Sequence, residues 1–325
     1  ICRCTGYKSI EKAGFEIENK LIHKDQNHQI DWLISNAFIP NYFKDIPNKL
    51  KAIPIQKFSS KGIKVANGTD LFVRFADQMA TKEMHLLAHN KVLNGITFKS
   101  KTCVIGANST VTEMAENSKL QTLFPKLHQF LKLVSSEQIR NMGTFGGNFV
   151  NASPIGDMSI FFLALNATIT IIDSEEKERE LPFQQFHIDY KKYDLKANEI
   201  IKSISFPIQT KNTHFNFEKV CKRTHLDIAS VNAAARITVQ NNLIIDAHFS
   251  IGGVAAVPKY LTNTNNFILG KELTLATIKA AEEVLQSEIT PISDVRGTIA
   301  YKRLLAKQLF FAHFITLFPT QFQLQ

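Results

Sequence analysis

The stretch that decides the fold is Asn141–Leu165, NMGTFGGNFVNASPIGDMSIFFLAL. It opens as a loop crowded with small and polar residues and continues as an apolar run from Met158 that suits a buried helix. A glycine-rich bend can bring backbone N–H groups against a pyrophosphate, because glycine accepts positive φ and allows close approach. A tight surface turn before a buried helix has the same composition, so this stretch alone leaves both interpretations open.

A second loop of the same kind lies upstream, in Lys64–Leu71, KVANGTDL. A short strand is followed by Gly68 and Thr69 at the bend and by Asp70, a pattern that also suits an ordinary Asx turn. Two glycine-bearing loops with hydroxyl and carboxylate groups nearby predict a two-sided cradle. Neither loop has the G-x-G-x-x-G or G-x-x-x-x-G-K-[ST] spacing, so a Rossmann unit or a P-loop is not supported.

The rest of the chain shows strands first and helices later. Short apolar runs bounded by turn residues predict strands at 63–66, 71–75, 102–106, 167–173, 199–207, 215–223, 233–240 and 243–253. Asn241-Asn242 is typical of a hairpin turn. Helical spacing appears at 118–134, where Pro125 is a possible break, and at 275–286 and 297–318. This order predicts an α+β class, and 325 residues suit two domains with a boundary near Pro207–Asn212.

Composition narrows the function classes. Hydrophobic residues make up 44% and charged residues 21%, which excludes disorder as the main state. The net charge of +9 comes from scattered basic residues, so we expect no nucleic-acid binding. The longest apolar stretch, 158–172, is interrupted by polar residues and is shorter than the ~20 residues of a membrane helix, so we expect no membrane partner. Four cysteines suit a reducing compartment, and we expect a cytoplasmic protein.

The N-terminal sequence ICRCTGYKSI places Cys2 and Cys4 on either side of one residue. Two such thiolates can ligate a metal or an iron–sulfur cluster, but a cluster needs four protein ligands. Taken alone, two ordinary thiols explain the pattern better. The chain does not begin with Met, and we expect it to be a fragment or a processed chain.

Taken together, these segments resemble the FAD-binding subunit of the xanthine dehydrogenase family of molybdenum hydroxylases. The stretches that carry the resemblance are CRCTGYKSI, KVANGTDL, GTFGGNFVNASPIGD, KVCKRTHLDIASVNAAARI, SIGGVAAVP and ISDVRGTIAYKRLLAKQL. The resemblance implies an α+β chain with a PCMH-type, vanillyl-alcohol-oxidase-like FAD-binding domain and then a domain like the carbon monoxide dehydrogenase flavoprotein C-terminal domain. The implied parts are a remnant of a helical [2Fe–2S] domain at 1–10, a linker at 11–45, the FAD-binding domain at 46–209 and the last domain at 210–318.

The resemblance also implies which residues bind the flavin. The first loop contributes Lys64, Val65, Ala66, Asn67, Gly68, Thr69, Asp70 and Leu71. The second loop contributes Thr144, Phe145, Gly146, Gly147 and Asn148. Asp157 closes the flavin site, Val134 lies near the flavin, and Ile201 and Lys219 add contacts at the edge of the second domain. The first loop reads Ala66-Asn67-Gly68 where relatives often have Gly-Gly, a mild departure because Asn tolerates left-handed backbone.

Cys2 and Cys4 match half of a [2Fe–2S] ligand set. The partner cysteines are absent from this sequence, so a cluster is expected only in the full-length protein. No catalytic residue is identified. The implied function is electron relay in a hetero-oligomer: a molybdopterin-binding large subunit hydroxylates a purine, and electrons pass through iron–sulfur clusters and FAD to NAD+. Alternatives are the flavin subunit of a carbon monoxide or aromatic-substrate dehydrogenase, or a non-catalytic scaffold with the same fold.

Overall fold

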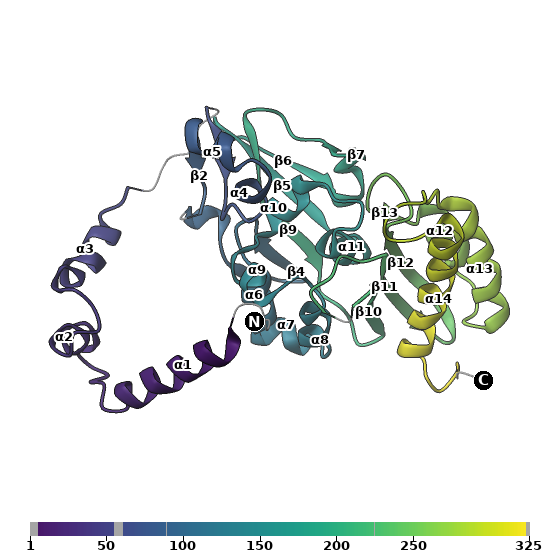
Figure 1. Cartoon of the computed structure of the whole chain (residues 1–325). Coiled ribbons are helices and arrows are strands. Elements are labelled where there is room, and N and C mark those ends of the chain that lie inside the picture. Colours follow the sequence, from purple (N-terminus) through teal and green to yellow (C-terminus); the bar gives the residue numbers. More distant parts are fainter. Residues whose placement is uncertain (1–5, 55–60, 89, 224, 323–325) are drawn as a thin grey trace. The chain divides into compact units, whose positions relative to one another are not determined.

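A computed structural model describes residues 6–54, 61–88, 90–223 and 225–322. The chain divides into two units, residues 1–55 and 56–325 (Figure 1). The first unit contains α1 (Tyr7–Leu21), α2 (Gln29–Ser35), the 3-10 helix η2 (Asn41–Asp45) and α3 (Ile46–Lys51). No residue of these helices is buried. The sequence analysis did not anticipate α1. Cys2 and Cys4 lie outside the described residues.

The second unit begins with a parallel strand pair, β1 (Ile63–Val65) and β2 (Met84–Leu86). The chain between them forms α4 (Leu71–Arg74) and α5 (Ala76–Thr81). The strand predicted at 71–75 is therefore wrong. The N–H of Phe72 donates to the carbonyl of Gly68, and the N–H of Arg74 donates to that of Asp70, so the backbone closes helical turns locally. The apolar side chains Phe72 and Val73 are exposed, so no burial of apolar surface would be gained by pairing this run in a sheet.

A five-stranded antiparallel sheet forms the middle of this unit, in the order β3-β4-β9-β5-β6. Its strands are β3 (Ile96–Lys99), β4 (Thr102–Gly106), β5 (Thr168–Asp173), β6 (Glu178–Pro182) and β9 (Glu199–Pro207). Strand β9 is central: Phe206 pairs with Cys103 on one side, and Ile204 pairs with Ile169 on the other. A small hairpin, β7 (His187–Asp189) and β8 (Lys192–Tyr193), follows the 3-10 helix η4 (Phe183–Gln185).

Short helices between β4 and β5 complete this domain. They are α6 (Val111–Glu116), α7 (Ser118–Leu123), α8 (Leu127–Lys132), α9 (Glu137–Met142), α10 (Phe145–Asn151) and α11 (Asp157–Ala164). The predicted helix at 118–134 is two helices with a break at 124–126, because Pro125 has no N–H to donate. Every residue of α11 after Asp157 is buried.

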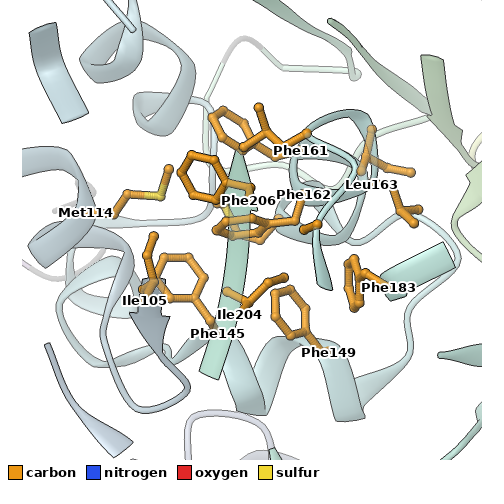
Figure 2. Close-up of a cluster of buried hydrophobic side chains, with 14 of the residues drawn as sticks. Ile105, Met114, Phe145, Phe149, Phe161, Phe162, Leu163, Phe183, Ile204 and Phe206 are labelled. Carbon is orange, nitrogen blue, oxygen red and sulfur yellow. The ribbon is translucent and has the colours of Figure 1, made fainter. Parts of the chain in front are cut away.

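Phenylalanines dominate the core around α10 and α11 (Figure 2). The ring of Phe162 meets the rings of Phe145 and Phe149 edge-on, at centroid distances of 5.3 and 5.7 Å. Each fully buried phenylalanine stabilises the fold by about 1.5–3 kcal/mol, and edge-on ring pairs add a smaller amount. This packing fixes α10, the helix that carries the second glycine-rich loop, against α11.

The last part of the chain is an antiparallel sheet with helices on one face (Figure 1). Its elements are β10 (Thr213–Val220), β11 (Val231–Gln240), β12 (Leu243–Gly252), β13 (Lys259–Tyr260), α12 (Thr262–Ile268), α13 (Leu275–Glu288) and α14 (Ile299–Leu317). Alternate residues of β11, such as Val231 and Ile237, pack with the three helices, while α11 contacts the sheet residues between them. Asn241 and Asn242 both have positive φ in the β11–β12 turn, which confirms the predicted hairpin.

Candidate functional site

The first glycine-rich loop leaves β1 and turns sharply at Gly68. Gly68 has φ +71°, a left-handed conformation that favours glycine, and a Cβ there would lie 2.2 Å from Cδ2 of Phe72, so the Phe72 ring would have to move. Within the described part of the chain, no protein acceptor meets the backbone N–H groups of residues 67–71. Buried or half-buried donors of this kind are normally satisfied, so the loop presents a row of N–H groups to an acceptor from outside the chain.

The second loop is held differently. The N–H of Phe145 donates to the carbonyl of Ser109 at 3.2 Å, and the N–H of Gly146 donates to that of Ala107 at 2.7 Å. These two amides are therefore engaged inside the protein and are not free to bind a phosphate. Thr144 caps α10, since its Oγ1 accepts from the N–H of Gly147 at 3.2 Å. In the described residues the N–H groups of 145–148 are all paired within the protein, and in 144–148 only that of Thr144 meets no protein acceptor. The sequence predicted exposed amides on this loop as well as on the first.

The two glycines of the second loop have different surroundings. A Cβ on Gly146 would lie 3.1 Å from Cβ of Ala107, so a larger residue there would force Ala107 to shift by a few tenths of an ångström. A Cβ on Gly147 would lie 2.9 Å from Oγ1 of Thr144, which would have to shift, and the space beside Gly147 is otherwise open to 4 Å. The side-chain oxygen of Asn148 is buried and has no hydrogen-bond partner in the described structure. Open space and an unsatisfied polar atom in adjacent residues are features of a ligand-binding loop.

The two loops lie side by side. Nδ2 of Asn67, on the first loop, donates to the carbonyl of Met142, just before the second loop, at 2.8 Å. At the far end of the loops, Arg74 donates to Asp70 at 3.3 Å and to the side chain of Asn151 at 3.5 Å. Residues that are far apart in the sequence thus contact each other, which is the arrangement that a two-sided cradle needs.

A second polar cluster surrounds Asp157, the first residue of α11. Nζ of Lys219, on β10, donates to Oδ2 of Asp157 at 2.7 Å and to the carbonyl of Leu133 at 2.8 Å. Nδ2 of Asn232, on β11, donates to Oδ1 of Asp157 at 2.6 Å. The Lys219 side chain is only 2% exposed. Burial raises the pKa of the Asp157 carboxyl above its ordinary value, against the opposing effect of Lys219 and Asn232.

The remaining predicted contacts fall in two places. Val134 follows Leu133, whose carbonyl Lys219 binds, so it lies beside the Asp157 cluster, and its side chain is buried. Ile201 lies on β9 opposite Ile171, with its side chain in the core. The structure therefore gathers the two loops into one group, and Asp157, Lys219 and Val134 into another.

Four polar residues of these groups were not among the predicted flavin contacts: Asn232, Asn151, Arg74 and Lys191. Lys191 lies between β7 and β8, and its Nζ donates to Oδ1 of Asn151 at 2.9 Å. A signal existed for Asn232, which is a lone amide in the otherwise apolar run VNAAA. Arg74 and Lys191 carried no such signal, because surface cations are common.

The described residues contain neither a cluster of metal ligands nor a membrane-spanning helix. Nowhere among them do three or more His, Cys, Asp or Glu side chains gather as a metal site. No helix in the described ranges has both the length and the apolar character needed to cross a membrane.

Comparison with known proteins matches both halves of the chain. Residues 38–209 match the family described as the FAD binding domain in molybdopterin dehydrogenase, and residues 217–317 match the CO dehydrogenase flavoprotein C-terminal domain. A xanthine dehydrogenase from Oryza sativa subsp. japonica is 32% identical over 193 residues, which cover 57% of this chain and 14% of that protein. The glyceraldehyde dehydrogenase medium chain of Sulfolobus acidocaldarius is 30% identical, over 67% of this chain and 74% of that protein.

Solved structures share the fold. A chain of reconstituted CO dehydrogenase from Oligotropha carboxidovorans superimposes with a TM-score of 0.74 at 22% identity, covering 82% of this chain and 93% of that chain. The predicted fold class is confirmed: an α+β domain of the FAD-binding type is followed by a domain of the CO dehydrogenase flavoprotein C-terminal type. This chain spans only 14% of the length of the rice enzyme it matches.

Proposed function

Because the chain belongs to the family of FAD-binding domains in molybdopterin dehydrogenases, we propose that it binds FAD and passes electrons through it. The observation that carries the proposal is the pairing of the two loops. The first loop offers unpaired N–H groups at 67–71, and the second offers open space at Gly147 and the unsatisfied oxygen of Asn148. These features fit a flavin dinucleotide: its diphosphate needs N–H donors and close backbone approach, while the Asn148 oxygen needs an N–H or O–H donor from the cofactor.

Two groups of residues would hold different parts of the cofactor site. The N–H groups of 67–71, with the hydroxyl of Thr144, would hold the diphosphate, and the side-chain oxygen of Asn148 would accept from an N–H or O–H group of the cofactor. The Asp157–Lys219 pair, with Asn232 and the buried Val134, would form a fixed polar wall at the junction with the C-terminal sheet. When bound, FAD supplies reversible two-electron and one-electron chemistry, and the protein supplies orientation and a controlled electrostatic environment.

The finer proposal is a subunit of a xanthine dehydrogenase-like molybdenum hydroxylase. In it, residues 46–209 bind FAD, 210–318 form the second domain, NAD+ accepts electrons and a molybdopterin-binding large subunit is the partner. The match to a plant xanthine dehydrogenase supports it. Cys2 and Cys4 would contribute to a [2Fe–2S] cluster of the full-length protein. The match to a glyceraldehyde dehydrogenase medium chain favours, with equal weight, the flavin subunit of a different molybdenum hydroxylase.

Reconstitution with FAD tests the proposal. The purified chain, stripped of flavin and incubated with FAD, is expected to regain one flavin per chain and the absorption spectrum of a flavoprotein. Reduction of that flavin by NADH, followed in the absence of oxygen, separates the two finer candidates, since only the first predicts rapid bleaching. A chain that stays colourless after reconstitution, while its circular dichroism shows a folded protein, would contradict FAD binding and favour the scaffold alternative.

A further inference from the structure

Two cations converge on one uncharged side chain beside the paired loops. Nη1 of Arg74 donates to Oδ1 of Asn151 at 3.5 Å, and Nζ of Lys191 donates to the same oxygen at 2.9 Å and also to the Asn151 carbonyl. Arg74 ends α4, Asn151 ends α10, and Lys191 has φ +58° in the turn between β7 and β8. Three separate elements thus bring two positive charges together.

The charges in this cluster do not balance. Asp70 pairs with Arg74 at 3.3 Å, while Lys191 donates to the side chain and carbonyl of Asn151, which carry no charge. Burial lowers the pKa of Lys191, and the charge of Arg74 lowers it further, while Asp70 opposes them. Two like charges held this close repel each other unless an anion lies against them. The cluster therefore carries a positive excess.

The same place also holds the unpaired amides. Asp70 belongs to the first loop, and the N–H groups of 67–71 meet no protein acceptor in the described part of the chain. A guanidinium, an ammonium and several free N–H groups are the donors that bind phosphate in proteins. A carboxylate ligand would use one or two of them, whereas a diphosphate has oxygens for all.

We propose that Arg74 and Lys191 form a diphosphate-binding subsite for a dinucleotide, an inference that rests on the proposed function. The diphosphate belongs either to FAD itself or to a second dinucleotide that docks against the bound flavin. Lys191 also has a structural contribution, because a cation at the C-terminal carbonyls of α10 stabilises that helix. Among the described residues the Arg74 side chain donates to no helix-end carbonyl, so helix capping does not account for the pair.

The experiment compares flavins with and without the diphosphate. Arg74→Gln and Lys191→Gln are purified without flavin, and the dissociation constants of FAD and riboflavin are measured by quenching of flavin fluorescence. Lys192→Gln is the matched control, because Lys192 lies next in the sequence, is exposed and pairs with Asp189. On the FAD-loaded variants, the rate of flavin reduction is measured as a function of NADH concentration. Arg74→Lys and Lys191→Arg test whether a side chain of the same charge restores binding.

If the subsite holds the diphosphate of FAD, each Gln variant weakens FAD binding about tenfold and leaves riboflavin binding unchanged. If it holds a second dinucleotide, FAD binding is unchanged and the half-saturating NADH concentration rises about tenfold. In both cases Lys192→Gln behaves as wild type and the charge-conserving variants recover most of the loss.

Other outcomes overturn the subsite. One is an equal loss of FAD and riboflavin binding together with a lower melting temperature, because that pattern is a structural effect. The other is no change in any binding measurement. Wild-type protein that binds no flavin would overturn the proposed function and this subsite together. Wild-type protein that binds FAD, with variants that show no dinucleotide-specific loss, would overturn the subsite alone.

Discussion

Nζ of Lys219 lies 2.7 Å from Oδ2 of Asp157, so a strand of the C-terminal sheet holds the first residue of the buried helix α11. Asn232 binds the other carboxylate oxygen from the neighbouring strand. The carboxylate also lies at a helix N-terminus, where negative charge is favourable. The position of Asp157 therefore depends on two strands that come much later in the sequence.

Removal of the cation should be costly. Lys219→Met leaves Asp157 buried without its charged partner, and we expect the free energy of unfolding to fall by about 3–5 kcal/mol in urea titrations. The double variant Lys219→Met, Asp157→Leu should recover part of that loss. Lys202→Met, which breaks the more exposed pair with Glu178, is the control and should change stability by about 1 kcal/mol or less. Equal losses in the two single variants would contradict this account.

The two glycines of the second loop should respond differently to alanine. Gly146→Ala places a methyl group against Ala107, and we expect a loss of about 1–3 kcal/mol in stability. Gly147→Ala disturbs only the Thr144 cap, a loss of about 1 kcal/mol that the better helix propensity of alanine offsets. Gly147→Ala should lower the flavin content after reconstitution while its melting temperature stays close to that of the wild type. Full flavin content in Gly147→Ala would argue against close approach of the cofactor at this residue.

The contact between the loops should matter for binding more than for stability. Asn67→Ala removes the hydrogen bond to the carbonyl of Met142, which is exposed, so unfolding free energy should fall by about 0.5–1.5 kcal/mol. We expect a larger proportional effect on the FAD dissociation constant, since the first loop loses its attachment to the second. Asn36→Ala, which removes a similar exposed side-chain bond to a carbonyl in α2, is the control. Unchanged FAD affinity in Asn67→Ala would show that the loops are positioned independently.

Stability should fall in acid because of His313. Complete burial lowers the pKa of this imidazole from 6.5 to about 3, so the folded state keeps it neutral while the unfolded state takes up a proton below pH 6.5. Its contribution is fully present above pH 6.5 and declines by about 1.4 kcal/mol per pH unit as pH falls towards 3. His313→Gln, which can still accept the hydrogen bond from Asn216, should flatten the pH dependence of unfolding free energy. An unchanged slope would contradict a neutral buried His313.

The sequence predicted the parts of this structure that depend on neighbouring residues. The two glycine-rich bends, the Asn241-Asn242 hairpin and the break at Pro125 all follow from local backbone preferences. The run at 71–75 was wrong because a local turn at Gly68, followed by exposed side chains, outweighed its apolar character.

The polar contacts that complete the site could not be predicted in the same way. Asn232 reaches Asp157 from a residue far along the chain, and Lys191 reaches Asn151 through a hairpin. Such contacts depend on tertiary packing: the lone amide of Asn232 stands out in the sequence, but no local pattern shows which residue it meets. The resemblance to a known family supplied Asp157 and Lys219 as flavin contacts but not the bond between them.

The central place of β9 has a consequence for synthesis on the ribosome. The two strands that flank it, β4 and β5, are made first and cannot pair with each other, because β9 lies between them. The five-stranded sheet can be completed only after residue 207 has left the exit tunnel. By then both glycine-rich bends have long been outside the ribosome. Non-local pairing of this kind slows folding, so the nascent chain offers a long interval for chaperones to bind.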